Sequence, residues 1–252
     1  MEGVKFLKST QIIILGICFA LATIFSTIIL SQALMKAKKF STEVIDVTGS
    51  AEKYLASDKI VWTASFSRRA PQLVAAFKEL KSDLKEVMDY FKAKGVKEEE
   101  VVISPVSSEI LYKKDEKGND TNEIEGYVLT QGIEIESRDV TRVSEVSRNS
   151  TELIEKGIEF ISAAPQYFYT RLAELKLEML AEASRDARER AERMVSAAGN
   201  KIGPMRSARM GIFQITPANS YEISDWGMND TSSLEKKVTA VVHAQFAISE
   251  KD

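Results

Sequence analysis

The chain has 252 residues, of which 44% are hydrophobic and 28% are charged, and its formal net charge at pH 7 is -3. This composition is typical of a folded chain with a substantial core and excludes an intrinsically disordered protein. Basic and acidic residues are interspersed, whereas nucleic-acid binding requires clustered lysine and arginine. We therefore exclude nucleic acid as a partner.

The N-terminal region contains a long uncharged segment. Residues 11–34, QIIILGICFALATIFSTIILSQAL, lie between Lys8 and Lys36 and carry no charge. About 20 apolar residues are enough to cross a bilayer as one helix. We predict an uncleaved signal-anchor helix here. Cleavage stays an alternative because residues 31–33, SQA, are a small-x-small pattern, although signal-peptide cores usually have about 7–15 residues.

The expected organisation follows from this helix. We assign residues 1–10 to a short cytoplasmic N terminus, 11–34 to the transmembrane helix, 35–42 to a linker and 43–250 to one folded domain. Basic residues occur on both sides of the helix, so charge counting alone does not give its orientation. The only cysteine, Cys18, lies in the helix after Ile17, where a lipoprotein would carry a small residue. We interpret Cys18 as an apolar helix residue.

The first strands are predicted at 44–53 and 59–68, where β-branched and aromatic residues are frequent and apolar positions alternate. Gly49 lies in the first of them and could suggest a phosphate-binding loop. Such a loop requires Gly-Lys-Ser or Gly-Lys-Thr at the start of a helix, and here Ser50 and Ala51 follow. We interpret Gly49 as a structural bend or bulge.

Two long helices are predicted from apolar spacing. The first begins at Pro71 and ends at Gly95. Its expected apolar face is Leu73, Phe77, Leu80, Leu84, Val87 and Phe91. The second helix covers 171–198, and small residues dominate its expected buried stripe. That stripe is Ala173, Leu177, Leu180, Ser184, Ala187, Ala191, Met194 and Ala198.

The remaining segments predict further strands and one weaker helix. In chain order, they are a hairpin with its turn at 117–120, a helix at 139–156, a strand at 158–170 interrupted by Pro165, a strand at 201–216, a loop at 217–233 and a last strand at 234–249. Together these elements indicate an α+β fold, mostly antiparallel sheet with packed helices, after one N-terminal transmembrane helix.

Residues with catalytic or metal-binding chemistry are few. His243 is the only histidine and lies in the last predicted strand, so we interpret it as a strand-face residue without a catalytic duty. The hairpin tip has Asp115, Asn119, Asp120 and Glu123, but lacks the ligand spacing of a calcium loop. We expect no catalytic residue, no metal and no cofactor.

The predicted loop at 217–233 contains the candidate interaction residues. Tyr221, Trp226 and Met228 are large apolar side chains in an otherwise polar segment. Either they fold back over the core, or they are anchors for a partner, as tryptophan and tyrosine often are. The sequence leaves both alternatives open.

Several segments in this order resemble the SIMPL domain family of bacterial envelope proteins. They are VTGSAEKYLASDKIVWTASF at 47–66, KAKGVKEEEVVIS at 92–104, GYVLTQGIEIESRDV at 126–140 and AEASRDARERAERMVSAAGNKIG at 181–203. The resemblance covers residues 44 to about 249. Ser57 stands before Asp58 where the family commonly has proline, which makes that turn less rigid.

The resemblance implies an antiparallel α+β fold, a periplasm-facing domain and, in a relative, assembly into ring-like oligomers. It supplies no agreed activity, although roles in envelope or oxidative stress are implied. We expect a non-enzymatic inner-membrane protein whose periplasmic domain acts by self-association, as a homo-oligomer, or by binding envelope partners. Alternatives are a module that binds small molecules or lipids and a hydrolase with an unrecognised carboxylate site.

Overall fold

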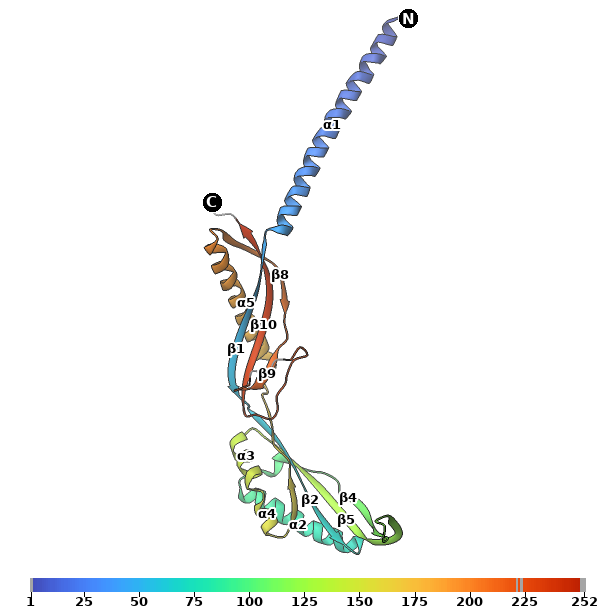
Figure 1. Ribbon diagram of the computed structural model, residues 1–252, viewed down its shortest axis with the longest axis vertical. Coiled ribbons are helices and arrows are strands. Elements are labelled where there is room, and N and C mark those ends of the chain that lie inside the picture. Colours follow the sequence, from blue (N-terminus) through green and yellow to red (C-terminus); the bar gives the residue numbers. More distant parts are fainter. Residues whose placement is uncertain (1, 221, 223, 250–252) are drawn as a thin grey trace. The chain divides into compact units, whose positions relative to one another are not determined.

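The computed structural model describes residues 2–220, 222 and 224–249, with the side chains of 2–13 and 36–42 left aside (Figure 1). Its elements are α1 (Glu2–Thr42), β1 (Val44–Ala56), β2 (Lys59–Ala70), α2 (Leu73–Ala93), the short 3-10 helix η1 (Glu98–Glu100), β3 (Val101–Ile103), β4 (Ser107–Lys114), β5 (Asp120–Ser137), α3 (Val140–Asn149), α4 (Glu152–Glu155), β6 (Glu159–Ser162), β7 (Gln166–Phe168), α5 (Leu172–Ala197), β8 (Lys201–Met210), β9 (Gln214–Pro217) and β10 (Glu235–Ser249). The α+β fold with antiparallel sheets and packed helices is confirmed.

The N-terminal helix α1 contains an apolar segment of membrane-spanning length. Among the residues whose side chains are described, this segment is Ile14–Met35, with 22 residues and a mean hydropathy of 2.3. Such a helix is a membrane anchor or a signal sequence. Residues 35–42, expected as a linker, continue the same helix.

The chain is divided between two compact units, and α1 belongs to the first of them. Unit 1 contains Met1–Ser50, Leu180–Gly211 and Val241–Asp252, and unit 2 contains Ala51–Met179 and Ile212–Ala240. The segment 43–250, which the sequence indicates as one domain, therefore contributes to both. Each unit is described by itself.

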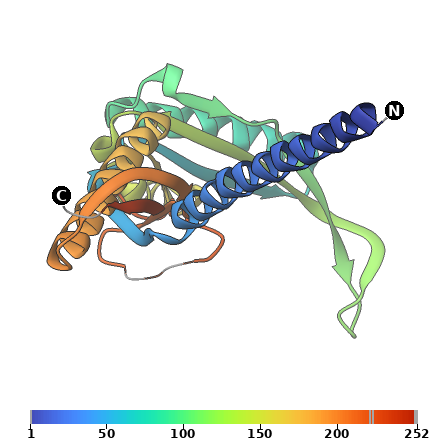
Figure 2. The ribbon, with the colours of Figure 1, turned by 90° about the horizontal axis from the view of Figure 1, so that it is seen from above.

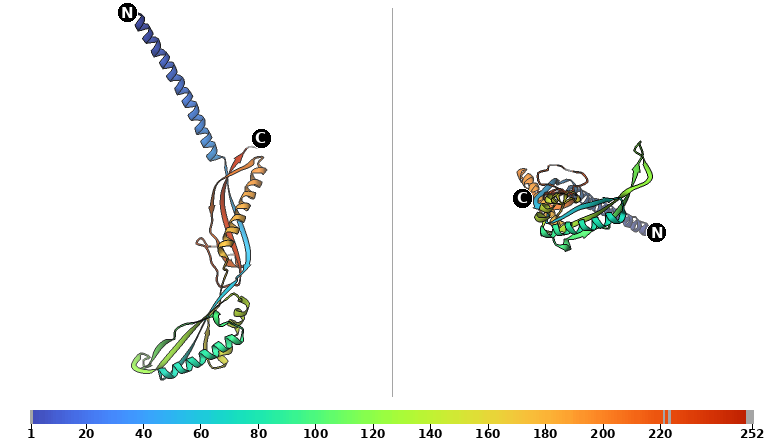
Figure 3. Two further views of the ribbon diagram at one scale, coloured as in Figure 1. Left: turned by 180° about the vertical axis from the view of Figure 1, so that it is seen from behind. Right: turned by 90° about the horizontal axis from the view of Figure 1, so that it is seen from below.

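Unit 1 is a sheet in the order β1-β10-β8, with α5 along one face (Figure 3). The close packing depends on Gly49, because a Cβ at this position would overlap the backbone of Ala183 and Ala187 in α5. The backbone N–H of Ser50 donates to Oδ2 of Asp186 in the same helix, at 2.8 Å. Gly49 lies within β1, where it allows the close approach of the helix to the strand.

The buried stripe of α5 differs from the expected one. The buried residues are Leu175, Met179, Ala183, Ala187, Ala191 and Val195, whereas Leu177 is 71% exposed and Met194 is 58% exposed. The buried positions recur every four residues, while the predicted stripe alternated steps of four and three. Four residues turn a helix by about 40° more than one full turn, so the buried line winds around α5. Only Ala187 and Ala191 belong both to the predicted stripe and to the observed buried line.

Unit 2 has β2 at the centre of its larger sheet, in the order β3-β5-β2-β6, with β4 on β5 and β7 on β2. β2 pairs antiparallel with β5 from Ile60 opposite Ser137 to Ala70 opposite Tyr127. The β4–β5 hairpin, in green, extends away from α2 and the rest of this sheet (Figure 2). The predicted strand at 158–170 is divided into β6 and β7, and Pro165 lies in the break.

The core of unit 2 forms where α2 packs on this sheet. Trp62 is almost fully buried and contacts Phe91 of α2 edge to face, with ring centroids 5.7 Å apart. Its indole Nε1 donates to Oγ of Ser162 at 3.0 Å and to the carbonyl of Ala163 at 3.1 Å. The apolar face of α2 is rotated from the expected one at its start, because Phe77 is 50% exposed while Ala76 is buried.

Candidate interaction site

The loop between β9 and β10, residues 218–234, is fixed to unit 2 by backbone hydrogen bonds. The N–H of Ile215 in β9 donates to the carbonyl of Met228 at 2.8 Å, and the N–H of Asp230 donates to the carbonyl of Ile215 at 3.0 Å. Ile215 and Asn229 form an isolated parallel bridge. The loop therefore runs beside β9 at residues 228–230, where it forms this single bridge.

A buried ion pair closes the base of this loop. Nζ of Lys236 in β10 lies 3.1 Å from Oδ2 of Asp230, and the two side chains are 2% and 8% exposed. The same ammonium donates to the backbone carbonyl of Asp230 at 2.6 Å. Asp230 also accepts hydrogen bonds from the backbone N–H and the hydroxyl groups of Ser232 and Ser233. A buried pair of this kind requires such satisfied geometry to offset the loss of solvation.

These contacts decide the ionisation of Asp230. Burial acts to raise the pKa of this carboxyl group, but the hydrogen bonds from Ser232, Ser233 and Lys236 outweigh burial and hold its pKa well below the usual range. The carboxylate is therefore ionised at neutral pH, where it pairs with the ammonium group of Lys236. The ion pair between Asp230 and Lys236 is a clamp between the loop and β10.

The clamped loop displays Trp226 to solvent. The Trp226 side chain is 97% exposed. Its backbone N–H donates to Oγ of Ser224 at 3.2 Å, and Gly227 after it has a positive φ of 87°. A turn with this backbone conformation favours glycine, and the close approach of Gly227 to the carbonyl of Phe213 leaves little room for a side chain.

The three candidate residues of this loop differ in their positions. Trp226 does not cover the core. Met228 is partly buried and holds the loop through its backbone carbonyl. Tyr221 lies outside the described residues. A role for these residues in binding stays a prediction. The sequence did not predict the clamp formed by Asp230 and Lys236. Asp230 and Lys236 are six residues apart on either side of a turn, and this spacing does not by itself indicate an ion pair.

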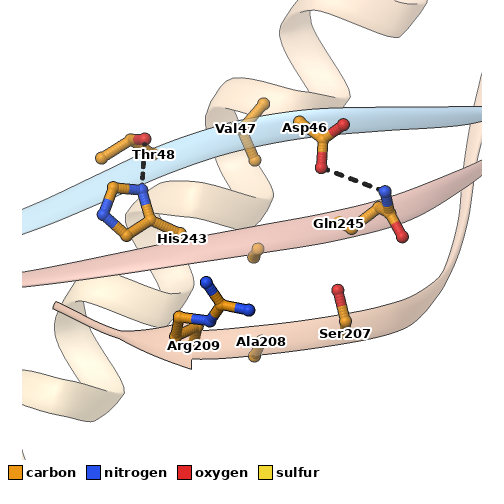
Figure 4. A pocket seen from close by; sticks show the side chains of 9 residues that line it. Asp46, Val47, Thr48, Ser207, Ala208, Arg209, His243 and Gln245 are labelled. Atoms are coloured by element: carbon orange, nitrogen blue, oxygen red, sulfur yellow. Dashed lines mark hydrogen bonds between the residues drawn. The ribbon is translucent and has the colours of Figure 1, made fainter.

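A second feature, in unit 1, is a polar hollow on the sheet face opposite α5. Its volume is about 450 Å³ (Figure 4). The hollow is lined by Asp46, Val47, Thr48, Ser207, Ala208, Arg209, His243, Ala244 and Gln245. Polar side chains occupy it because alternate residues of β1 and β10 face α5 and are buried, which leaves the others on the open side.

His243 lies in this hollow, exposed on the strand face where the sequence placed it. Its Nδ1 is 2.9 Å from Oγ1 of Thr48 in β1. In the next row, Nε2 of Gln245 donates to Oδ1 of Asp46 at 3.1 Å. The hollow therefore contains an imidazole and a carboxylate that are each held by a neighbour across the sheet.

The family model described as SIMPL, protein of unknown function (DUF541), matches residues 45–246 of this chain. The chain belongs to the SIMPL family. The match covers both compact units, so β1, α5 and β10, which contribute to both, are parts of one SIMPL domain. A search of curated proteins returned no match.

In this SIMPL protein, the acidic hairpin tip forms a hydrogen-bonded turn. Oδ1 of Asp115 accepts from the backbone N–H groups of Lys117 and Asn119, at 2.8 and 2.9 Å. Glu123 pairs with Lys113 at 2.8 Å. In the described part of the chain, no three His, Cys, Asp or Glu side chains come together in an arrangement that could hold a metal ion.

The carboxyl groups of the SIMPL domain with resolved pKa changes all shift in one direction. Their pKa values are lowered by hydrogen bonds and basic neighbours at Glu100, Asp115, Glu123, Asp186 and Asp230. At Glu100 and Asp230, burial opposes this change and is outweighed. These five groups are carboxylates at neutral pH and act as hydrogen-bond acceptors.

Proposed function

We propose that this SIMPL protein is a non-enzymatic, membrane-anchored protein of the bacterial envelope that acts by self-association or by binding envelope partners. In this proposal α1 stays uncleaved in the inner membrane and the SIMPL domain faces the periplasm. The process it serves is an envelope or oxidative stress response. The observation that carries the binding function is the display of Trp226 on a clamped loop.

An exposed tryptophan suits a binding anchor for two physical reasons. Burying an aromatic side chain of this size against a partner removes a large apolar area from water. Trp226 is 97% exposed, so nearly all of its area is available. The described segment 224–230 is also already held by the Asp230–Lys236 pair and by backbone hydrogen bonds to Ile215, so binding does not have to order it. Preordered anchors lose less conformational entropy on association.

The anchor function of α1 is supported by its length and composition. Its apolar segment Ile14–Met35 has 22 residues, which suits a bilayer core of about 30 Å at 1.5 Å per residue. Signal-peptide cores are shorter, about 7–15 residues. A reporter that is active only in the periplasm, fused after Asp252, tests the orientation. An inactive periplasmic reporter together with an active cytoplasmic one would refute it.

The binding function is tested by the absolute mass of the full chain in detergent micelles. Light scattering after size exclusion should give a discrete oligomer for the natural protein, and Trp226→Ala should lower its mass. Val74→Ala is the matched control, because Val74 is another highly exposed apolar residue in unit 2. Equal masses for the natural protein, Trp226→Ala and Val74→Ala would show that self-association does not depend on Trp226.

The partner-binding alternative requires a second measurement. A photo-crosslinking residue at position 226, in membranes, should form a discrete adduct that is absent when the same residue stands at position 74. A monomer in detergent that also forms no adduct at 226 would refute both forms of the proposal.

A further inference from the structure

The polar hollow of unit 1 has two rows of side chains that cross all three strands. In the first row, Thr48 of β1 and Arg209 of β8 lie on either side of His243, which is directly opposite Arg209 in the β10–β8 register. In the second row, Asp46 and Ser207 lie on either side of Gln245. Figure 4 shows these side chains on one face of the sheet.

The two rows differ in how their charges are satisfied. The carboxylate of Asp46 accepts a hydrogen bond from Gln245. The Arg209 guanidinium group makes neither a hydrogen bond nor an ion pair within the described part of the chain, and the hydroxyl group of Ser207 makes no hydrogen bond there. A guanidinium group has five N–H donors in a planar fork that matches the two oxygens of a carboxylate or phosphate. The unused donors are therefore the guanidinium group of Arg209 in the first row and the hydroxyl group of Ser207 in the second, and the second row also has the carboxylate of Asp46.

His243 adds a further polar group to the same end of the hollow. Its Nδ1 is engaged by the Thr48 hydroxyl, which fixes the ring. When Nδ1 accepts that hydrogen bond, the proton of the neutral imidazole is on Nε2, which is then a donor. The Thr48 contact thus positions the imidazole beside Arg209 across the sheet.

We propose that this hollow binds a small molecule through one oxyanionic group, a carboxylate or a phosphate, held by Arg209 with the Ser207 hydroxyl and the His243 imidazole. The volume of about 450 Å³ lies within the range of small-molecule sites, about 300–1,000 Å³. Charge-assisted hydrogen bonds from arginine to an oxyanion are stronger than neutral ones.

Asp46 limits the kind of ligand. It lies one row from the guanidinium group and carries a negative charge, so a second anionic group placed there is repelled. The ligand therefore presents its oxyanion to Arg209 and a neutral or cationic group to Asp46. This binding site lies on the sheet of unit 1 and goes beyond the partner contact that we propose for Trp226.

The chain offers a specific reporter for this site, because His243 is its only histidine. The experiment is a titration of the full chain in detergent micelles with inorganic phosphate and, separately, with acetate. The imidazole signals are followed by NMR at constant pH, and sodium chloride keeps the ionic strength constant. We expect a saturable shift of the His243 signals with each anion. A shift that does not saturate, or that chloride reproduces, overturns the proposal.

Variants separate binding by Arg209 from nonspecific charge effects. Arg209→Ala should weaken the apparent affinity roughly tenfold, as expected for the loss of a charge-assisted hydrogen bond. Arg188→Ala is the matched control, since Arg188 is an exposed arginine on α5 in the same unit. Equal weakening by both substitutions would show a general charge effect and would overturn the proposal.

A third variant excludes damage to the fold as the cause. Asp46→Asn removes the negative charge and leaves an amide oxygen that can still accept from Gln245. It should tighten binding of phosphate several-fold, because the repulsion is lost. Structural damage would weaken binding. Unchanged or weaker binding in Asp46→Asn would therefore contradict the placement of the anion in this hollow.

Discussion

Breaking the Asp230–Lys236 pair should destabilise unit 2 by an amount that depends on which partner is removed. Asp230→Asn removes the negative charge, so the buried ammonium keeps only neutral acceptors, namely the carbonyl of residue 230 and the amide oxygen of the new side chain. Removal of one partner from a buried pair costs about 3–5 kcal/mol, and this substitution should fall near the upper end. Lys236→Met should fall near the lower end, since Ser232 and Ser233 still donate to the carboxylate.

The double substitution Asp230→Asn with Lys236→Met gives a sharper test. It removes both charges and fills the site of the Lys236 side chain with an apolar chain of similar length. Because no unpaired charge stays buried in it, the double variant should be more stable than Asp230→Asn alone. The coupling between the two substitutions should be on the order of 2 kcal/mol or more.

The assay is urea unfolding of the full chain in micelles, followed by the fluorescence of Trp62 in a Trp226→Phe background. The chain has two tryptophans, and Trp62 is buried in the core of unit 2. Arg193→Met, which breaks an exposed pair with Glu189, should cost less than about 1 kcal/mol. A loss below about 1 kcal/mol for Asp230→Asn, or an additive double variant, would refute the reasoning.

Three further outcomes follow from particular contacts. The pKa of Asp230 is lower in the folded state, so the stabilisation by its carboxylate is present above the unfolded-state pKa of about 3.9 and is lost as the pH falls toward the folded-state pKa. The difference in unfolding free energy between the natural protein and Asp230→Asn should therefore shrink below about pH 4. Gly49→Ala should destabilise unit 1 by about 1–3 kcal/mol or more, because the added methyl group overlaps the backbone of α5. Unfolding followed by circular dichroism measures this loss. An unchanged free energy of unfolding would contradict the close packing of α5 on β1. Trp62→Phe should cost about 1–3 kcal/mol, since the acceptors Ser162 and Ala163 lose their donor. Urea unfolding followed by circular dichroism measures this loss, and a smaller one would show that water replaces the indole.

The sequence predicted the elements well where the apolar period was strong. The strand β2, the long helices α2 and α5 and the last strand β10 all follow from alternation or helical spacing. It was wrong about the buried face of α5, because a regular heptad stripe was assumed where the buried line winds around the helix. Leu177 and Met194 have the apolar character of core residues, and only tertiary packing shows that they face solvent.

The candidate interaction residues were found for a local reason. Trp226 stands out because a large aromatic residue in a polar, turn-rich segment has few neighbours that could bury it. The clamp beneath it was not predictable in the same way. An Asp and a Lys six residues apart, on either side of a turn, are common on protein surfaces. Only the return of the chain beside β9 buries Asp230 and Lys236 together.

The polar hollow shows the same limit at longer range. Thr48 and His243 are 195 residues apart in the sequence, and each is unremarkable in its own strand. They meet because β10 lies between β1 and β8, a strand order that no local pattern specifies. The register between β8 and β10 then decides which residue of β8 lies opposite His243. A shift of one residue would place Ala208 or Met210 there and would turn the Arg209 guanidinium group to the other face of the sheet. An anion site of this kind therefore depends on strand order and register. For this reason a chain with one histidine and no recognisable binding motif can still contain an anion site.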